Sequence, residues 1–370
     1  MALVRLRFLI LALAAAAAAC GAPRAEIRGV WVDRAPLATR ESIAEMMDAL
    51  KAANFNAVFV NVWSRGYPLW RSALFERHTG VATDPAFGER DVLAEAIEEG
   101  KARGLAVIPW VEYGFVIGYS GGRAPLVEAH PDWLAMRKDG SSDFSWAGTT
   151  KSYWIAHAHP EGQQFLLDLM AELAANYDVP AVQFDRARYP ELDCGYDPAT
   201  KARYAQDHDG AEPPSNERDP AWMRWRADRL NDFVLRLAKR LRAANWRLLV
   251  TNAPIVYGFS YANFLQEYPA WAKAGALDFV SPQVYRRDPE SFAAELDRQL
   301  AALGGDGARL APGVDVTNSD AATLVRFVEM CRERELAGAV VWYYGGLVAK
   351  DALRRLRETV YSEPAPLPWK

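Results

Sequence analysis

EGQQFLLDLMAELAANYDVPAVQFDRARYP, residues 161–190, holds the unit that decides the fold. Residues 161–177 place apolar side chains at helical spacing, and residues 181–184 form a short apolar run of the kind that is buried in a parallel sheet. Charge follows at once, with Asp185 and Arg186. The segment therefore predicts a helix, a buried strand, and a charged cluster directly after that strand.

The same alternation of strand and helix recurs along the chain. We expect further strands at 28–33, 57–63, 105–114, 247–254, 277–285, 309–316 and 336–346, and helices at 41–56, 91–104, 161–177, 220–244, 268–276, 289–303, 320–335 and 349–359. Eight such units predict an α/β fold, a single-domain (β/α)8 TIM barrel over 27–360, with a long loop after strand 3, another after strand 4, and a C-terminal tail over 361–370. The alternative, an open doubly wound sheet, would need a glycine-rich turn after the first strand, where the sequence has Asp33-Arg34-Ala35-Pro36.

The N-terminal sequence has the pattern of an export signal. Arg5 and Arg7 precede an apolar run that ends in small residues before Cys20, which predicts a signal peptide over 1–19. The position of Cys20 predicts lipidation there, followed by a linker over 20–26; the alternative is simple cleavage, with the cysteine incidental. We therefore expect an exported lipoprotein of the cell envelope, anchored in a membrane on its periplasmic face. The short linker would hold the bottom of the barrel near the lipid and point the opposite end away.

Composition narrows the classes of partner and cofactor. The chain has 370 residues and a net charge of −4, so we expect no nucleic-acid partner. The 13 tryptophans either fill the core or stack on sugar rings. His157 and His159 lack further ligands at metal spacing, so no metal and no cofactor is expected. Cys194 and Cys331 fall in distant parts of the barrel, which predicts no disulfide. We expect a monomer.

Polar residues at the strand ends predict the site, because the carboxyl ends of barrel strands meet at one rim. Glu112 ends the third strand and Asp185 the fourth, and two carboxylates are what glycoside hydrolysis requires. Alternation along the strand points Gln183 and Asp185 inward together. In the alternative, Asp185 has only a structural role, as the buried ion-pair partner of Arg186 or Arg188. Asp33 is a further candidate for a catalytic carboxylate. The expected substrate-binding residues are Trp63, Arg65, Tyr113, Arg188, Tyr189, Asn252, Gln283, Tyr285, Asp315 (also a candidate catalytic carboxylate) and Trp342.

Several segments together resemble the family-ten glycosyl-hydrolase-like proteins, which are bacterial (β/α)8 barrels. The segments are RGVWVD, NFNAVFVNVWSRGYPLWRS, IPWVEYGF, HPDWL, YDVPAVQFDRARYP, GYDPAT, WMRWRADRLNDFV and LDFVSPQVY. The resemblance implies action on polysaccharide glycosidic bonds, with peptidoglycan glycan strands as one known theme. Two positions depart from the family pattern: Arg186 stands where a second aspartate is common, and Ala156 where an asparagine is common. The first departure shifts the second carboxylate role to Glu112.

Two other function classes stay open. The first is a non-catalytic, membrane-tethered glycan-binding barrel, which the arginine at position 186 keeps in consideration. The second is a hydrolase of ester or amide bonds, but the sequence has no Gly-x-Ser-x-Gly elbow and no plausible cysteine nucleophile. The sequence therefore favours a glycoside hydrolase that acts on a cell-envelope polysaccharide.

Overall fold

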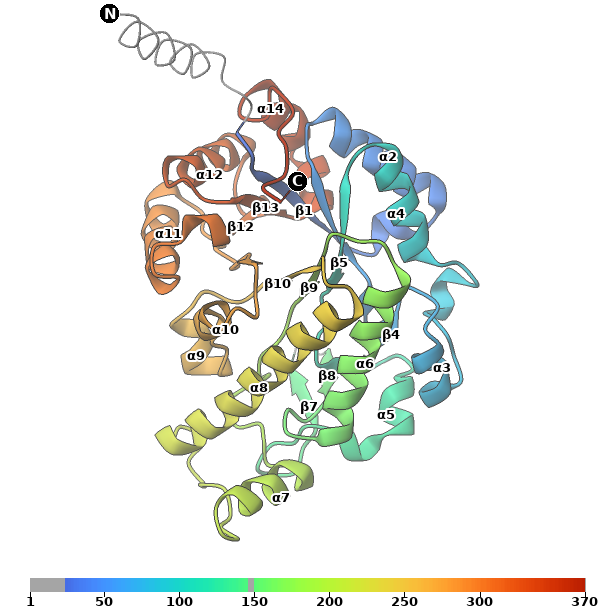
Figure 1. Ribbon diagram of the computed structural model, residues 1–370, viewed down its shortest axis with the longest axis vertical. Coiled ribbons are helices and arrows are strands. Elements are labelled where there is room, and N and C mark those ends of the chain that lie inside the picture. Colours follow the sequence, from blue (N-terminus) through green and yellow to red (C-terminus); the bar gives the residue numbers. More distant parts are fainter. Residues whose placement is uncertain (1–23, 146–149, 370) are drawn as a thin grey trace, which may run out of the picture.

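The structure is a computed structural model that describes residues 24–145 and 150–369. Eight parallel strands form one sheet in the order β11-β10-β9-β5-β2-β1-β13-β12. Two isolated parallel bridges, Val280 to Leu310 and Gln283 to Gly313, join its two ends and close the ring. The predicted TIM barrel is therefore confirmed (Figure 1). The strands are β1 Ile27–Val32, β2 Ala57–Asn61, β5 Ala106–Val111, β9 Ala181–Phe184, β10 Leu249–Asn252, β11 Phe279–Val280, β12 Gly313–Asp315 and β13 Gly338–Trp342.

Helices cover the outside of the barrel, and each expected helix is present. Aspartates before four of them accept a hydrogen bond from a backbone N–H in the first turn, which explains where these helices begin. The eight helices are α2 Arg40–Ala52, α4 Val92–Ala102, α6 Pro160–Asn176, α8 Pro220–Ala244, α10 Tyr268–Lys273, α11 Pro289–Ala302, α12 Ala321–Glu333 and α14 Ala352–Glu358.

The observed strands are shorter than the apolar runs that predicted them, because those runs continue into buried loop segments. The run at 57–63 stops being a strand at Asn61, and 277–285 keeps only two strand residues. The connections hold further short elements: β3 Trp63–Ser64, β4 Tyr67–Pro68, α3 Ala73–Thr79, β6 Val116–Tyr119, α5 Pro125–Ala129, β7 Asp143–Ser145, β8 Lys151–Trp154, α7 Pro198–Asp207, α9 Phe259–Phe264, α13 Tyr344–Ala349, and the 3-10 turns Ala35–Leu37, Pro85–Phe87, Pro131–Trp133 and Gly307–Arg309.

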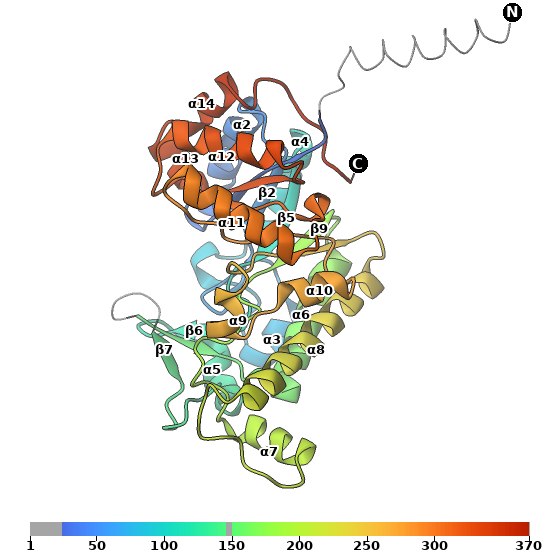
Figure 2. The same cartoon turned by 90° about the vertical axis from the view of Figure 1, so that its left-hand side faces the viewer.

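The two predicted long loops, after β5 and after β9, pack against each other. The first carries a three-stranded sheet in the order β6-β8-β7, and the second carries α7. A bridge between Arg137 and Cys194 joins them, and the Met136 carbonyl accepts the N–H groups of Gly195 and Tyr196. In Figure 2, β6, β7, α5 and α7 gather at the end of the molecule opposite α12 and α14. The two loops thus build one wall beside the barrel.

The apolar side chains divide into two main cores. One lies inside the barrel and includes Trp31, Phe59, Ile108, Trp110 and Ala181. The larger one lies between the strands and the helices, and takes the alternate residues of the same strands, such as Val30, Val58, Val107 and Val182. This division follows the alternation of side chains along a strand. Residues such as Gln183 and Asp185, which share the parity of Ala181, therefore point into the barrel.

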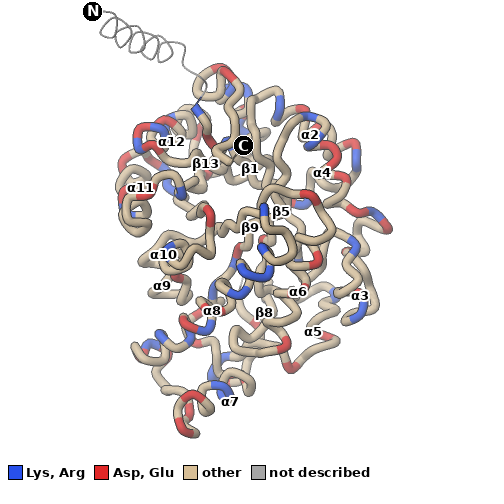
Figure 3. Tube along the Cα trace, in the orientation of Figure 1, with Lys and Arg blue, Asp and Glu red and all other residues tan. Residues whose placement is uncertain are grey.

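The first and last described segments, near Glu26 and Pro366, lie at the amino ends of the barrel strands. The Glu26 N–H donates to the Pro366 carbonyl at 3.0 Å, so the start of β1 lies beside the C-terminal tail. The predicted signal peptide and Cys20 fall outside the described residues. Cys194 and Cys331 are buried and free. Within residues 24–145 and 150–369, no helix has the length and apolar character needed to span a bilayer. Acidic and basic positions alternate over α2, α4, α11 and α12 (Figure 3).

Candidate active site

Asp185 follows β9 and points into the mouth of the barrel. Its Oδ2 accepts the Trp110 indole N–H at 3.2 Å and a weaker bond from the Gln283 amide at 3.4 Å. Its Oδ1 accepts the backbone N–H of Arg186 at 2.5 Å. The side chain is only 5% exposed, and burial raises the pKa of Asp185 although these donors favour its charged form. Three donors, one on β5 and the other two in the segments that follow β9 and β11, thus fix the carboxylate in one orientation.

Glu112 follows β5, the neighbouring strand, and as a residue it is 9% exposed. The Asn61 amide donates to Oε2, and the Arg186 guanidinium lies 3.3 Å from Oε1. Burial is the largest influence on this carboxyl and raises its pKa to about 7; the charge of Asp185 adds to the rise and Arg186 opposes it. Glu112 therefore exchanges its proton near neutral pH, as a general acid–base must.

Arg186 connects the two carboxylates. It has a left-handed backbone with φ of 44°, which turns the chain directly after Asp185 and aims the guanidinium back at Glu112. The guanidinium also donates to the Glu112 carbonyl at 2.5 Å and lies over the Tyr113 ring at 4.7 Å. Gly114 permits this approach, because a Cβ there would lie 2.2 Å from the Asp185 carbonyl oxygen. The close approach of the backbone at Gly114 to that at Asp185 thus fixes the two acids relative to each other.

Aromatic rings lie beside Asp185. The Trp342 ring lies 5.8 Å from Trp110 and 6.3 Å from Tyr285. Tyr285 is partly exposed, and burial together with the nearby charges of Asp185 and Asp315 raises its pKa well above the ordinary value. Trp110 is buried, but Trp342 and Tyr285 are partly exposed and offer apolar ring surface beside the carboxylates, an arrangement that suits a sugar ring with its hydroxyl groups.

Two cavities are lined by residues next to the acids. A cavity of about 610 Å³ includes Arg65 and Tyr113 in its lining, together with Tyr119 of β6. A second, of about 640 Å³, includes Gln283 and Tyr285. Tyr113 follows Glu112 in the chain and Gln283 donates to Asp185, so each cavity borders a neighbour of one of the two acids.

Three of the expected binding residues do not face the site, which corrects the sequence prediction. Trp63 is 0% exposed, and its indole N–H donates to the backbone carbonyls of the turn after β5, because the chain has already left β2 and entered a hairpin. Tyr189 is 1% exposed and stacks on His157 at 3.9 Å. Asn252 is 2% exposed, has the outward parity of Val250, and donates to the Phe184 carbonyl.

Three other residues that the sequence predicted for the site lie at the rim, and they differ in what their side chains already contact. Asp315 is at the end of β12, but its carboxylate accepts hydrogen bonds from Thr317 and Asn318, so its own loop occupies it. Asp33 lies close enough to raise the pKa of Glu112. Arg188 is partly exposed and lies over the Trp154 and Phe264 rings at 5.4 and 4.8 Å.

The sequence prediction missed two residues that act on the acids. Asn61 donates to Glu112, and Trp110 donates to Asp185. Both have the inward parity of their strands, shared with Phe59 and with Glu112 itself, so the alternation that pointed to the acids could have found them. In the described part of the chain, no group of three or more His, Cys, Asp and Glu side chains could hold a metal ion.

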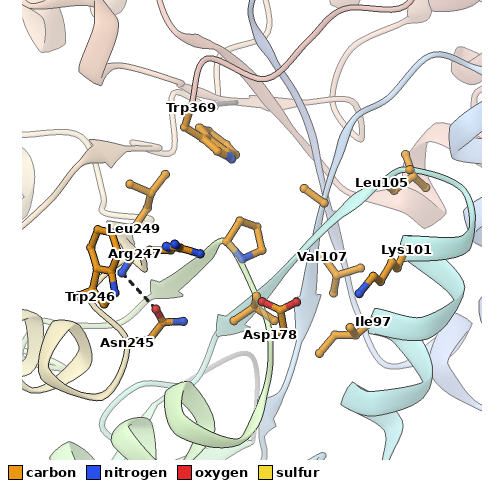
Figure 4. Close-up of a pocket in the computed structure, with 14 residues that line it drawn as sticks. Ile97, Lys101, Leu105, Val107, Asp178, Asn245, Trp246, Arg247, Leu249 and Trp369 are labelled. Atoms are coloured by element: carbon orange, nitrogen blue, oxygen red, sulfur yellow. Dashed lines mark hydrogen bonds between the residues drawn. The ribbon is translucent and has the colours of Figure 1, made fainter.

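A cavity of about 670 Å³ lies at the other end of the barrel (Figure 4). It is lined by the amino ends of strands and by Trp246 and Trp369, with Lys101 and Asp178 on its other side. Because catalytic groups of these barrels gather at the carboxyl ends of the strands, the smaller cavities beside Glu112 and Asp185 are the relevant ones.

Comparisons with known proteins agree with this architecture. The sequence model described as glycosyl hydrolase-like 10 matches residues 26–304. Glycosyl hydrolase YngK of Bacillus subtilis is 25% identical, over 70% of this chain and 54% of its own; glycosyl hydrolase DigH of Escherichia coli K12 is 22% identical, over 66% and 58%. The chain thus spans little more than half the length of these relatives.

Two solved structures share the fold along most of this chain. The PgaB (BpsB) glycoside hydrolase domain of Bordetella bronchiseptica aligns with a TM-score of 0.66 at 16% identity, covering 90% of this chain and 98% of that one. The catalytic domain of β-amylase from Paenibacillus polymyxa aligns with a TM-score of 0.65 at 12% identity, covering 93% and 100%. At these identities the likeness concerns the fold alone.

Proposed function

This chain belongs to the glycosyl hydrolase-like 10 family, and from that premise we propose that it hydrolyses glycosidic bonds of a cell-envelope polysaccharide, with peptidoglycan glycan strands as the first candidate. The observation that carries the proposal is the buried pair of Glu112 and Asp185 at the mouth of the barrel. Each is bound by donors from neighbouring strands, and each has a pKa raised by burial. Paired carboxylates in such an environment are the equipment of glycoside hydrolysis.

The two environments suggest different roles. Glu112, with a pKa of about 7, would protonate the leaving oxygen and afterwards accept a proton from water. Asp185 is oriented by three N–H donors, which oppose the rise that burial causes in its pKa and suit a carboxylate that stabilises or attacks the positive sugar carbon. Arg186 would hold Glu112 in place while the proton moves.

The glycan would cross the mouth of the barrel between the two flanking cavities. Tyr113 borders one cavity and Tyr285 the other, while Gln283 offers an amide beside Asp185. Trp342 supplies a ring face next to Tyr285. One cavity beside Tyr113 and another beside Gln283 would fit a substrate that continues in both directions from the bond being cut.

One observation favours a second candidate, a glycan-binding barrel without catalysis. Arg186 occupies the position after Asp185 and pairs with Glu112 at 3.3 Å, and a permanent ion pair would keep Glu112 charged and unable to donate a proton. The two candidates differ in one measurable outcome, the release of reducing ends.

The test is product analysis by mass spectrometry, with purified protein acting on peptide-free glycan strands. The wild type is expected to release oligosaccharides, and Asp185→Asn to bind the strands without releasing any. Asp232→Asn, which removes an exposed acid on α8, is the matched control and should keep full activity. Binding by the wild type without product from any glycan would favour the second candidate.

We also propose that Cys20 carries the lipid anchor. The described chain begins at Arg24, three residues before β1, at the amino end of the barrel. An anchor there would direct the opposite end, with the two acids, away from the membrane and toward the wall. Cys20→Ser should move the protein from the membrane fraction to the soluble fraction; sedimentation of that variant with membranes would contradict the anchor.

A further inference from the structure

A large aromatic side chain is exposed at the end of the barrel opposite the two acids. Trp246 follows α8 and is 78% exposed, compared with 57% for Phe259, which follows the carboxyl end of β10. A single exposed apolar side chain needs no explanation by itself. Trp246, however, borders the cavity of about 670 Å³ together with Trp369 (Figure 4). The ring and the cavity form one feature, which glycan hydrolysis at the other end does not use.

The turn that carries Trp246 is closed by hydrogen bonds. The Leu248 N–H donates to the Asn245 carbonyl at 3.1 Å, and the Arg247 N–H donates to Asn245 Oδ1 at 3.1 Å. The Arg247 guanidinium lies over the Trp246 ring, 4.9 Å from its centroid. The turn therefore presents an indole ring and a cation together to the surroundings of the protein.

Charged side chains from three loops stand around the cavity. Arg247 comes from the loop after α8, Lys101 from the end of α4, and Asp178 from the loop after α6. A phosphoethanolamine head group carries a phosphate and an ammonium group, so each of its charges would meet one of opposite sign here. Tryptophan is also the side chain that favours the head-group level of a bilayer, because its ring is apolar and its N–H is polar. Ring and charges together match the surface of a phospholipid bilayer.

The same end of the barrel holds the start of the described chain. The Arg24 guanidinium donates to the Leu336 carbonyl at 2.9 Å, in the loop before β13. The Glu26 N–H donates to the Pro366 carbonyl, and Trp369 follows shortly after in the same tail. In Figure 2 the C-terminus and the loop after α8 lie on the same side of the molecule. The chain therefore enters the barrel close to the cavity that Trp369 borders.

A lipid on Cys20 would be joined to Arg24 by a short length of chain. Four residue steps span at most about 14 Å when fully extended. Because Arg24 is held against the amino end of the barrel, the bilayer surface would have to lie near that end. An exposed indole there is then close to the head groups, whereas Glu112 and Asp185 lie at the far end. The position and length of the tether thus select a lipid surface as the partner of this face.

We propose that the amino end of the barrel docks on the phospholipid bilayer, with Trp246 among the head groups and one head group in the cavity beside it. The inference rests on the proposed anchor at Cys20 and deepens it, since it adds a second point of attachment. A single attachment would leave the barrel free to rotate. Two attachments fix its orientation and keep the mouth of the barrel turned away from the membrane.

The test measures the surroundings of position 246 while the protein is on a membrane. The lipidated protein is reconstituted in vesicles of phosphatidylethanolamine and phosphatidylglycerol, and Trp246→Cys carries an environment-sensitive fluorophore. Cys194 and Cys331 are buried and should not react with the label. We expect emission at shorter wavelength and loss of quenching by iodide, relative to Cys20→Ser with the same label in buffer. Phe259→Cys is the matched control, and its label should stay open to iodide.

Two results of this measurement would overturn docking. The first is a label at position 246 that stays open to iodide on vesicles. The second is a label that becomes shielded when the protein concentration is raised without lipid, since this face would then pair two copies of the chain.

A second variant assigns the contact to the ring. In the Cys20→Ser background, Trp246→Ser should lower the partition of the protein into these vesicles about 10-fold, the effect of withholding part of a large apolar side chain from the interface. Phe259→Ser should leave the partition unchanged. Equal partition with and without Trp246 would refute the role of the ring. Hydrolysis of soluble glycan by Trp246→Ser should match that of the wild type.

The anchor and the docking can fail separately. If Cys20→Ser leaves the membrane fraction while the label on the lipidated protein stays open to iodide, the anchor stands and docking fails. If Cys20→Ser still sediments with membranes, the label is measured in that variant. A shielded position 246 there means that this face holds the membrane without the lipid, and an open one overturns docking together with the anchor.

Discussion

Replacement of Glu112 by glutamine should change how the stability of the protein depends on pH. Glutamine keeps the size of the side chain and leaves an oxygen that can accept from the Asn61 amide. It cannot ionise, so the variant lacks the proton exchange of the buried carboxyl. The loss of a charged partner for Arg186 adds an offset to the stability, but that arginine stays charged throughout, so the offset is the same at every pH near neutrality.

The magnitude follows from the pKa of the carboxyl. Glu112 has a pKa of about 7 in the folded protein, raised by burial from 4.5. Between these two values the folded protein binds more protons than the unfolded chain, so stability is present at low pH and is lost as the pH rises. Integration of proton binding from pH 5 to pH 8 gives a loss of about 2.5 kcal/mol in the unfolding free energy of the wild type.

The assay is urea unfolding at half-unit pH steps, followed by tryptophan fluorescence. The free energy of the wild type minus that of Glu112→Gln should fall by about 2.5 kcal/mol between pH 5 and pH 8. Glu98→Gln removes an exposed carboxylate from α4 and is the control; its difference curve should vary little, because water solvates Glu98 in both states. A flat curve for Glu112→Gln would refute the raised pKa, and with it the assignment of Glu112 as the proton donor.

Three further outcomes are expected. Arg186→Gln removes the cation 3.3 Å from Glu112, which holds the pKa of that carboxyl down, so the basic limb of the pH profile of kcat/KM should move up by ~1 pH unit or more. If the limb does not move, the ionisation of Glu112 is not its cause. Trp110→Phe removes the indole donor to Asp185 and should lower kcat about 10-fold with little change in KM; an equal kcat would leave the hydrogen bond without a role. Gly66→Ala forces a Cβ into the facing backbone at a left-handed φ and should destabilise the protein by ~2 kcal/mol in urea unfolding; wild-type stability would show that the hairpin is free to move.

The barrel and its inward-facing acids could be predicted because both depend on local patterns. Eight apolar runs alternate with amphipathic helices, and the alternation within a run decides which side chains point inward. Gln183 and Asp185 obey that rule, as do Trp110 and Glu112. The rule requires only that an apolar run forms a strand, and the apolar composition of each run supports that assignment.

The rule failed where the strand had already ended. Trp63 continues the apolar run after Asn61, but the chain turns there into a hairpin whose tip is Arg65. Tyr189 follows β9 by five residues, past the left-handed turn at Arg186, so alternation no longer describes it. The pKa of Glu112 could not be predicted either, because its burial depends on loops from several strands that only the folded chain brings together.

The pairing of β1 with β13 has a consequence for how the chain must fold. β1 is the first strand to leave the ribosome and β13 the last, and the family match, which ends at 304, stops before both β12 and β13. Until those final strands are made, β1 keeps one open edge and the ring cannot close. A partly synthesised chain is therefore exposed to edge-to-edge association, and truncation after residue 304 should yield an aggregating fragment rather than a smaller folded barrel.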